Sequence, residues 1–448
     1  MSELLQFVNF KDLTVWSASN YLSINNINTK YALVKISELL KQVKNQEILE
    51  DETNYKLSGI HSYGRGLFHR NIKLGKDIKS KTLNKLKTNQ FVYSRLGSHT
   101  GSFDIVDNKL NNYYVSNEVP TFEFKNKNIN PYFVKLIFLL KQYWQDIEKS
   151  LQGTAHKRFK EKDFLNLKIP LPPLETQKII VKRYQDKLNL AKQQNQQAQQ
   201  IKAEIETYLY KELGIELPKE EQSKNALQFV NFKGLDRWDV AYLLNKNKII
   251  TDYDIITVSD IIDKFLKDKN NNSLRFNSQN YPSKKFQYIG MENIEKESGV
   301  LLEFQNVKGA EIKSQTIRLP KSFFLYGKLR PYLNKYFYNT FNGENIIISS
   351  EFFVFSVKNI DKLYFEFCLS SSFFQYQIIN YTKGARMPRI GEDVFKKIQI
   401  PLPPPEIQNK IAKHIQGLKD EIQTLKQQAE ENKKLALSEF EAEIFNVP

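Results

Sequence analysis

A proline cluster that occurs twice constrains this chain more than any other feature. The two copies are Ile169-Pro-Leu-Pro-Pro-Leu-Glu-Thr-Gln177 and Ile400-Pro-Leu-Pro-Pro-Pro-Glu-Ile-Gln408. Proline lacks a backbone N–H and has a fixed φ, so it can begin a helix but cannot continue one. Each cluster is followed by a long stretch rich in Lys, Glu and Gln. We therefore expect a globular segment to end at each cluster and a long helix to begin there.

The apolar residues after each cluster repeat with the spacing of a coiled coil. They recur at steps of three and four in the first stretch and hold a seven-residue period in the second. Such a stripe is narrower than the apolar face of an ordinary core helix. We expect helices over Leu174 to Leu213, ahead of a capping Gly214, and over Pro405 to Phe445, each roughly 60 Å long at about 1.5 Å per residue. The predicted seam consists of Val181, Tyr184, Leu188, Ala191 and Ile205 in the first helix and Ile411, Ile415, Leu418, Ile422 and Leu425 in the second.

The chain is an internal duplication. Residues 5–22 align with residues 227–244 at ten of eighteen positions, seven of them consecutive, and the shared aromatic and apolar residues are expected to form a buried anchor. Residues 31–90 and 253–322 share little, and similarity resumes at Tyr93 and Tyr326. Two domains that recognise different targets would keep a common scaffold and differ in this way within their loops.

Both halves of the chain combine strands with helices. Strands are predicted over Ile346 to Ile348 and Phe352 to Val357, where β-branched and aromatic residues cluster between turn signals. Helices are predicted over Pro131 to Leu140 and Lys362 to Leu369. The repeat then divides the chain into a first globular domain (1–172), a first long helix (173–217), a linker (218–226), a second globular domain (227–403) and a second long helix (404–448).

The composition limits which binding partners and which cellular compartment we expect for this chain. The chain has 448 residues with 66 Lys and Arg against 50 Asp and Glu, a net charge of +16 that favours a polyanion, with nucleic acid first. AT-rich coding also produces such a lysine-rich composition. The single cysteine, Cys368, excludes a disulfide within the chain and a cysteine-rich zinc site. No apolar run approaches the roughly 18 residues of a membrane span and the N-terminus lacks a basic signal-peptide head, so we expect a cytoplasmic protein.

No catalytic motif is present. The chain has no phosphate-binding Gly-x-x-x-x-Gly-Lys-Ser/Thr loop and no Asn/Asp-Pro-Pro-Tyr/Phe methyltransferase pattern. We also expect no Gly-x-Gly that lies after a strand and cradles a methyl-donor cofactor. Its five histidines lack metal-ligand spacing. Acidic residues such as Asp104 and Glu161 leave a nuclease site as an alternative, although no lysine–acid pair recurs in both copies. We predict no catalytic residue, metal or cofactor.

The loops suit the reading of nucleic acid. They carry Lys or Arg beside Tyr, Asn, Ser and Thr, which supply phosphate contacts, base-edge donors and stacking surfaces. Arginine is the most informative because its fork can bind guanine O6 and N7 together, whereas each of these residues can also be structural. The predicted DNA-binding residues are Arg65, Tyr93, Arg95, His99, His156, Lys157, Arg158, Tyr326, Lys328, Arg330, Tyr332, Lys383, Arg386 and Arg389.

This layout resembles the specificity subunit of type I restriction-modification systems. The resemblance rests on two divergent globular segments, each ending in a Gly-rich basic loop, an Ile-Pro-Leu-Pro-Pro-x-Glu-x-Gln cluster and a long helix. It implies an α+β fold with two mixed α/β target-recognition domains in a pseudo-two-fold arrangement, separated by two long helices that form an antiparallel coiled coil. The first copy departs from the second in its loop, with Ala155-His156 where the second has Arg386-Met387-Pro388.

The resemblance also implies a function and partners. Each domain would read one half of an interrupted site in double-stranded DNA, and the helices would act as a ruler. Two modification (adenine methyltransferase) subunits would bind the helices, restriction subunits (ATP-dependent translocase/nuclease) would join them, and the chain itself would catalyse nothing and contact no membrane. Two alternatives stay open: a restriction or modification enzyme whose active site is unrecognised, and a coiled-coil adaptor without a DNA function.

Overall fold

The computed structural model describes residues 28–151, 158–215, 250–266, 275–313, 315–343, 345–379 and 387–445. The expected anchors in 5–22 and 227–244 and the predicted linker 218–226 lie outside these ranges, and the domain boundaries stay predictions. The chain forms two compact units. The first contains residues up to Asn195 together with the C-terminal part from Gln427, and the second contains Gln196–Lys426.

The first unit contains two sheets and a two-stranded pair. One sheet has the order β2-β10-β7-β8 and the other the order β3-β6-β9-β4-β5, while β1 pairs with β11. Short helices lie between the strands, and three residues separate the end of β11 from the beginning of α6. The elements are β1 (Leu33–Lys35), α2 (Ile36–Leu39), β2 (Leu40–Val43), β3 (Gln46–Ile48), β4 (Asn54–His61), β5 (Gly66–Leu74), η2 (Gly75–Asp77), β6 (Thr82–Lys85), β7 (Phe91–Tyr93), η3 (Ser98–Thr100), β8 (Phe103–Ile105), η4 (Asn108–Leu110), β9 (Tyr114–Val115), β10 (Thr121–Phe124), α3 (Pro131–Ile137), α4 (Lys141–Ser150), α5 (Glu161–Asn166) and β11 (Lys168–Pro170).

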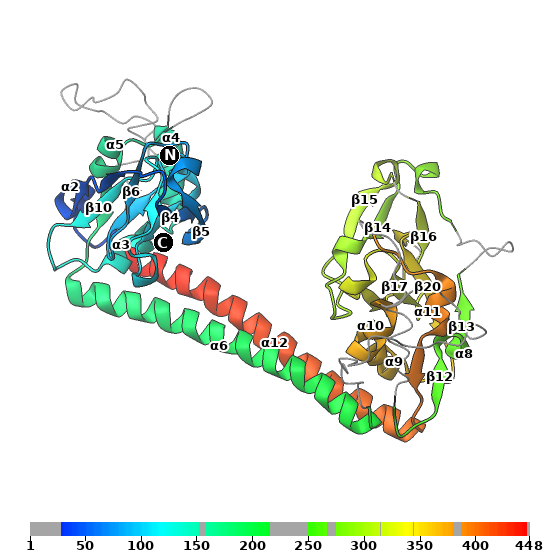
Figure 1. Cartoon of the computed structure of the whole chain (residues 1–448). Helices are drawn as coiled ribbons and strands as arrows, with labels where there is room; N and C mark the ends of the chain where they lie inside the picture. Colours follow the sequence, from blue (N-terminus) through cyan, green and yellow to red (C-terminus); the bar gives the residue numbers. More distant parts are fainter. Residues whose placement is uncertain are drawn as a thin grey trace, which may run out of the picture. The chain divides into compact units, whose positions relative to one another are not determined.

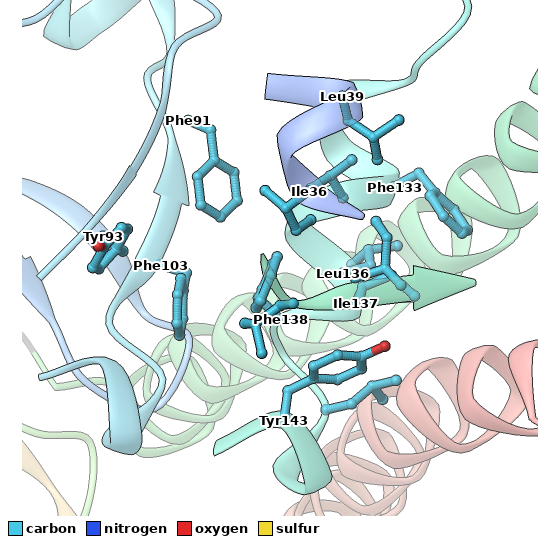
Figure 2. Close-up of a cluster of buried hydrophobic side chains, with 14 of the residues drawn as sticks. Ile36, Leu39, Phe91, Tyr93, Phe103, Phe133, Leu136, Ile137, Phe138 and Tyr143 are labelled. Atoms are coloured by element: carbon cyan, nitrogen blue, oxygen red, sulfur yellow. The ribbon is translucent and has the colours of Figure 1, made fainter. Parts of the chain in front are cut away.

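An aromatic core holds the first unit together. Phe91 and Phe103 project from β7 and β8 toward Phe138, which follows α3, and Tyr93 of β7 packs beside Phe103 (Figure 2). The ring centroids of Phe103 and Phe138 are 4.7 Å apart, and those of Tyr93 and Phe164 are 4.8 Å apart. Aromatic side chains bury large areas, so this cluster ties the four-stranded sheet to α3 and α5.

The second unit has the same kinds of element. Its sheets have the orders β13-β20-β17-β18 and β15-β14-β19-β16, and β12 pairs with β21. The strands predicted at 346–348 and 352–357 and the helices predicted at 131–140 and 362–369 are confirmed as β19, β20, α3 and α9. The elements are β12 (Ile255–Thr257), α8 (Val258–Ile261), β13 (Ile262–Phe265), η6 (Ser278–Asn280), β14 (Lys285–Ile289), η7 (Met291–Asn293), β15 (Gln305–Lys308), η8 (Gly309–Glu311), β16 (Thr316–Arg318), β17 (Phe324–Gly327), η9 (Pro331–Leu333), β18 (Tyr336–Tyr338), β19 (Ile346–Ser349), β20 (Phe352–Val357), α9 (Lys362–Ser370), α10 (Ser372–Ile379), α11 (Glu392–Lys397) and β21 (Gln399–Pro401).

The two units share one topology even where their sequences diverge. In one sheet of each unit a pair of strands is parallel, β4 with β9 in the five-stranded sheet of the first unit and β14 with β19 in a four-stranded sheet of the second. These pairs place Leu57 beside Tyr114 and Tyr288 beside Ile347. The edge strand β3 has a reduced counterpart, a single bridge between Phe276 and Thr316. The divergent segments therefore keep their strand order and differ in the connections between strands.

The two long helices begin at the proline clusters as predicted. They are α6 (Leu174–Leu213) and α12 (Pro405–Ile444), each of 40 residues. Gly214 follows α6 with φ +58°, and Ile215 N donates to Tyr210 O at 2.9 Å, the bond of a glycine-terminated helix. In the first unit the beginning of α6 lies beside the end of α12, and in the second unit the end of α6 lies beside the beginning of α12 (Figure 1). The helices are therefore antiparallel in both units.

Most of the predicted seam is buried or half-buried. Val181, Ala191, Ile411 and Ile415 are buried, and Tyr184, Ile205, Leu418, Ile422 and Leu425 are half-buried. Leu188 departs from the prediction because it is exposed. The preceding residue, Lys187, is half-buried and forms an ion pair of 3.0 Å with Glu439 of α12, so the stripe facing α12 runs through Tyr184, Lys187 and Ala191 and leaves Leu188 at its edge.

The predicted fold class is confirmed: each unit mixes helices and strands, and two long helices pack against each other. Within the described ranges, no helix has the length and apolar character needed to span a bilayer. Nor do the residues that the structure describes include a group of three His, Cys, Asp or Glu side chains that could hold a metal ion.

Candidate nucleic-acid interface

In the first unit, hydrogen bonds centred on Arg95 join three separate segments of the chain. We call this hydrogen-bonded cluster the bracket. Arg95 N donates to Glu118 O at 2.9 Å, and Phe159 N donates to Arg95 O at 2.9 Å. The Arg95 guanidinium donates to Asn117 O at 2.8 Å and pairs with the Glu161 carboxylate. The loop after β7, the turn before β10 and the segment before α5 are thereby held together.

The second unit repeats this bracket at equivalent positions. Lys328 N donates to Glu351 O at 2.8 Å, and Ile390 N donates to Lys328 O at 3.1 Å. The Lys328 ammonium donates to Ser350 O at 2.7 Å and lies 5.2 Å from the centre of the Phe353 ring. Arg95 and Lys328 thus use their charged groups to tie loops together, so they are positioning residues of the bracket.

Each bracket carries one arginine paired with a glutamate. Arg158 Nε donates to both Glu118 oxygens at 3.0 and 3.1 Å, and Arg389 donates through Nε and Nη2 to Glu351 at 3.2 and 3.1 Å. The exposed fractions of the two arginine side chains, 52% and 51%, are nearly the same. The carboxylate raises the pKa of each guanidinium, which stays charged and oriented. A half-exposed, oriented guanidinium can donate to a phosphate or to a base edge.

Two of the predicted DNA contacts are wrong. Tyr93 and Tyr326 have exposed fractions of 0%, because β7 and β17 are interior strands of their sheets. The Tyr93 hydroxyl donates to Phe159 O at 3.2 Å, and the Tyr326 hydroxyl accepts from Gln375 Nε2 at 2.9 Å. Burial raises the pKa of both phenols. They pack the core beneath the bracket and cannot stack on a base.

Other predicted residues lie on the surface next to the bracket. Arg330 is exposed, has φ +48° and donates from its backbone N to Pro388 O at 2.8 Å, and Tyr332 two residues later is 49% exposed. His99 occupies the position equivalent to Tyr332 and is half-buried. Arg65 is exposed in the turn between β4 and β5. His156, Lys157, Lys383 and Arg386 lie outside the described residues.

Sequence reasoning missed the carboxylates of the bracket. Glu118 and Glu351 each end a short motif that recurs in both copies, Val115-Ser-Asn-Glu118 and Ile348-Ser-Ser-Glu351. A carboxylate retained in both copies beside basic loops is the signal that could have identified them, because an isolated arginine in a loop gains orientation from such a partner.

Sequence reasoning also missed the two glutamines that end the proline clusters. Gln177 accepts from Asn130 N at 2.8 Å and donates to Pro172 O at 2.8 Å. Gln408 accepts from Asp361 N and donates to Pro403 O at the same distances. Both are almost fully buried. Each glutamine therefore hydrogen-bonds the start of a long helix to the N-terminus of a helix in the globular part, α3 or α9. We call Gln177 and Gln408 the joint glutamines, because they connect the long helices to the globular parts.

Known proteins resemble this chain in sequence and in fold. A curated relative, the MjaVIII specificity subunit of a type I restriction enzyme from Methanocaldococcus jannaschii, is 22% identical over 438 residues, which cover 90% of this chain and 89% of the relative. A solved structure from work on complex assembly and conformational transition of the type I R-M system matches with a TM-score of 0.55 and 12% identity, over 93% of this chain and 98% of the other. The HsdS subunit from Thermoanaerobacter tengcongensis matches with a TM-score of 0.44 and 13% identity, over 92% and 96%.

The family profile of the type I restriction modification DNA specificity domain matches twice, over residues 28–207 and 250–433. The two matches follow the internal duplication, since each covers one globular part and most of one long helix. The chain therefore belongs to the family of type I restriction-modification DNA specificity proteins.

Proposed function

We propose that this chain recognises DNA sequence for a type I restriction-modification complex, with each unit reading one half of an interrupted site. The observation that carries the proposal is the bracket that recurs in both units. In each, a half-exposed arginine is oriented by a glutamate at the same place in the fold. The family to which the chain belongs supplies the class of target, which is DNA.

Two linked readers discriminate better than one. A well-formed contact between a side chain and a base pair contributes about 1–3 kcal/mol of discrimination, so one small unit reads only a few base pairs reliably. When two units are joined in one chain, the second binding event becomes intramolecular and both half-sites contribute to the selection. A net charge of +16 adds attraction for the phosphates without sequence preference.

The two long helices have two roles in this proposal. They set the number of unread base pairs between the half-sites, and they bind two adenine methyltransferase subunits, which restriction subunits then join. The chain itself binds no cofactor and catalyses no step. Insertion of whole helical turns between Ala191 and Ala203 is expected to lengthen the gap while both half-site sequences stay readable. An unchanged gap in the methylated motif would show that the long helices do not set the spacing of the half-sites.

The proposal is tested by single-molecule methylome sequencing of a host with and without this gene, with the modification subunit expressed in both. We expect the loss of one interrupted, adenine-methylated motif when the gene is removed. Unchanged motifs would contradict the proposal. A methyl-donor binding assay on the purified chain addresses the enzyme alternative, because a recognition subunit should bind none and an enzyme should bind one equivalent.

A further inference from the structure

The turn between β4 and β5 has an unusual backbone. Tyr63 has φ +62°, and the two glycines that follow it, Gly64 and Gly66, have φ values of +69° and +77°. Glycine adopts this left-handed conformation freely, but an aromatic residue does so at a cost of about 1–3 kcal/mol and only where its surroundings hold it. Such strain in an exposed turn suggests a role for the side chains that the turn presents.

Hydrogen bonds from a neighbouring loop hold the turn in place. Tyr63 N donates to Thr100 O at 2.6 Å, and Gly64 N donates to Gly101 O at 2.9 Å. The Thr100 hydroxyl donates to the Ser62 hydroxyl at 2.9 Å. The supporting loop is the one that follows Arg95, so the turn is fastened to the bracket of the first unit.

The base of the hairpin is also fixed. Leu67 N donates to Asp104 Oδ2 at 2.5 Å, and the other oxygen of that carboxylate pairs with Lys135 at 2.5 Å. A Cβ on Gly101 would lie 2.3 Å from the ring of Trp144, so the glycine permits the close approach of α4 beneath the turn. The turn is therefore pre-organised, and little of its conformational entropy remains to be lost on binding.

The residues that this turn presents point outward. The Tyr63 side chain is 67% exposed, and its ring lies 6.3 Å from that of Trp144 at an angle of 62°, which leaves one face open. Arg65 is exposed, and its Nε donates to Ser62 O at 3.2 Å. Within the described ranges this is the one hydrogen bond of the Arg65 side chain, and the Tyr63 hydroxyl has none. An oriented guanidinium and an open aromatic face thus stand two residues apart on a rigid support.

The corresponding connection of the second unit is different in kind. Residues 290–304 join β14 to β15, and lysines of the long helices bind them within that unit. Lys202 pairs with Glu297 at 2.7 Å, and Lys426 pairs with Glu295 at 3.6 Å. An acidic connection that already contacts the helices is unsuited to a phosphate backbone, because like charges repel. The second unit instead exposes Arg330 and Tyr332, also two residues apart, on the loop after β17.

We propose that Tyr63 and Arg65 are specificity-determining residues of the first unit and insert into a groove of duplex DNA. The Arg65 guanidinium donates to the O6 and N7 acceptors of a guanine in the first half-site. The Tyr63 ring packs against the adjacent base or sugar and holds the turn in register. This inference rests on the proposed function, and it assigns the first half-site to a turn that has no equivalent reader in the second unit.

The test uses the full chain in complex with its methyltransferase partner. Initial methylation rates are measured on a panel of duplexes that carry every single substitution in both half-sites. The variants are Arg65→Ala, Arg65→Lys and Tyr63→Gly. Glycine accepts φ +62° without strain, so Tyr63→Gly removes the ring while the turn keeps its fold. The control is Lys76→Ala, an exposed cation paired with Glu52 at the other end of β5.

We expect Arg65→Ala and Arg65→Lys to lower discrimination at one guanine of one half-site by about tenfold or more, and to leave the other half-site unchanged. Tyr63→Gly should lower the rate on the cognate duplex by about tenfold, and Lys76→Ala should change nothing. Undiminished discrimination in both Arg65 variants would overturn the inference, as would an equal loss on every sequence, which marks a phosphate contact. If the wild-type complex methylates no interrupted site, the proposed function itself fails.

Discussion

The two globular units are the same scaffold with different surfaces. Their strand orders match, their proline clusters are fastened by equivalent glutamines, and their brackets place an arginine on a glutamate at the same point. They differ in the connection after β4 and β14: a tight cationic turn in the first unit and a long acidic connection held by lysines in the second. The buried strands thus keep one arrangement in both units, whereas the exposed connections between them differ in length, charge and contacts.

The helix pairing differs between the units as well. In the first, Gln194 donates to Gln428 at 3.0 Å and accepts from Asn432 at 3.0 Å, between the buried Ala191 and Ala429. In the second, apolar residues and a Tyr208–His414 ring contact of 4.0 Å fill the interface. A hydrogen-bonded polar layer in a coiled-coil seam selects one register, so the register of the pair is specified in the first unit.

The largest effect is expected for the alkylation rate of the single cysteine, which lies in the second unit. Cys368 lies in the second unit, and burial raises the pKa of its thiol to about 12 from an ordinary 9.0. Because the thiolate is the reactive form, alkylation of the folded chain at pH 8 should be on the order of a thousandfold slower than alkylation of the unfolded chain. Labelling with iodoacetamide at increasing urea checks this. Rapid labelling without urea would show that the second unit opens readily.

The next largest effect concerns the joint glutamines. Gln177→Leu leaves Asn130 N–H and Pro172 C=O unpaired, and should lower the free energy of unfolding of the first unit by about 2–4 kcal/mol. Hydrogen exchange should rise in peptides from α3 and stay constant in α9, and Gln408→Leu should do the reverse. The exposed Gln199→Leu should change little. Equal loss of protection in both helices would show that the units unfold together.

The bracket arginines should each affect binding by about tenfold. Arg158→Ala or Arg389→Ala removes one guanidinium and should reduce the slope of log affinity against log salt by about 1 if the group contacts a phosphate. Fluorescence anisotropy with a cognate duplex measures both quantities, and Lys321→Ala, an exposed cation away from the bracket, is the control. An effect of one variant without the other would mean that the two brackets have different roles despite their equal geometry.

The smallest effect is expected at the polar layer. Gln194→Leu should change the free energy of unfolding of the first unit by about 0.5–1.5 kcal/mol, because Gln428 and Asn432 can turn to solvent. The exposed neighbour Gln193→Leu should leave it unaltered. Urea denaturation monitored by hydrogen exchange of α12 peptides distinguishes the two variants. A loss above about 3 kcal/mol would mean that the layer is a major source of stability as well as of register.

Local signals in the sequence predicted much of the frame. The long helices were predicted to begin at the prolines and the first to end at Gly214, because proline, glycine and a seven-residue period act within a few positions. The strands β19 and β20 were predicted from another local signal, runs of β-branched and aromatic residues between turn residues. The predicted seam was wrong at Leu188, because steps of three and four allow either Lys187 or Leu188 between Tyr184 and Ala191, and Lys187 takes that position.

The surface could not be predicted as well, because it depends on contacts between distant residues. Tyr93 beside Arg95 suggests a stacking platform, but the order of strands places Tyr93 inside the sheet. The partner of Arg158 is Glu118, forty residues earlier in the chain. Tyr63 is marked as unusual by its φ, which no residue pattern reveals. Side-chain chemistry was readable from the sequence, and side-chain direction was not.

The most direct test of the account exchanges one unit. Residues 262–398, from β13 to the residue before β21, are replaced by the aligned segment of another family member with a different site, and the complex with the methyltransferase is assayed by methylome sequencing. The account predicts that one half of the methylated motif changes to that of the donor, while the other half and the gap are retained. A motif changed in both halves, or in neither, would contradict it.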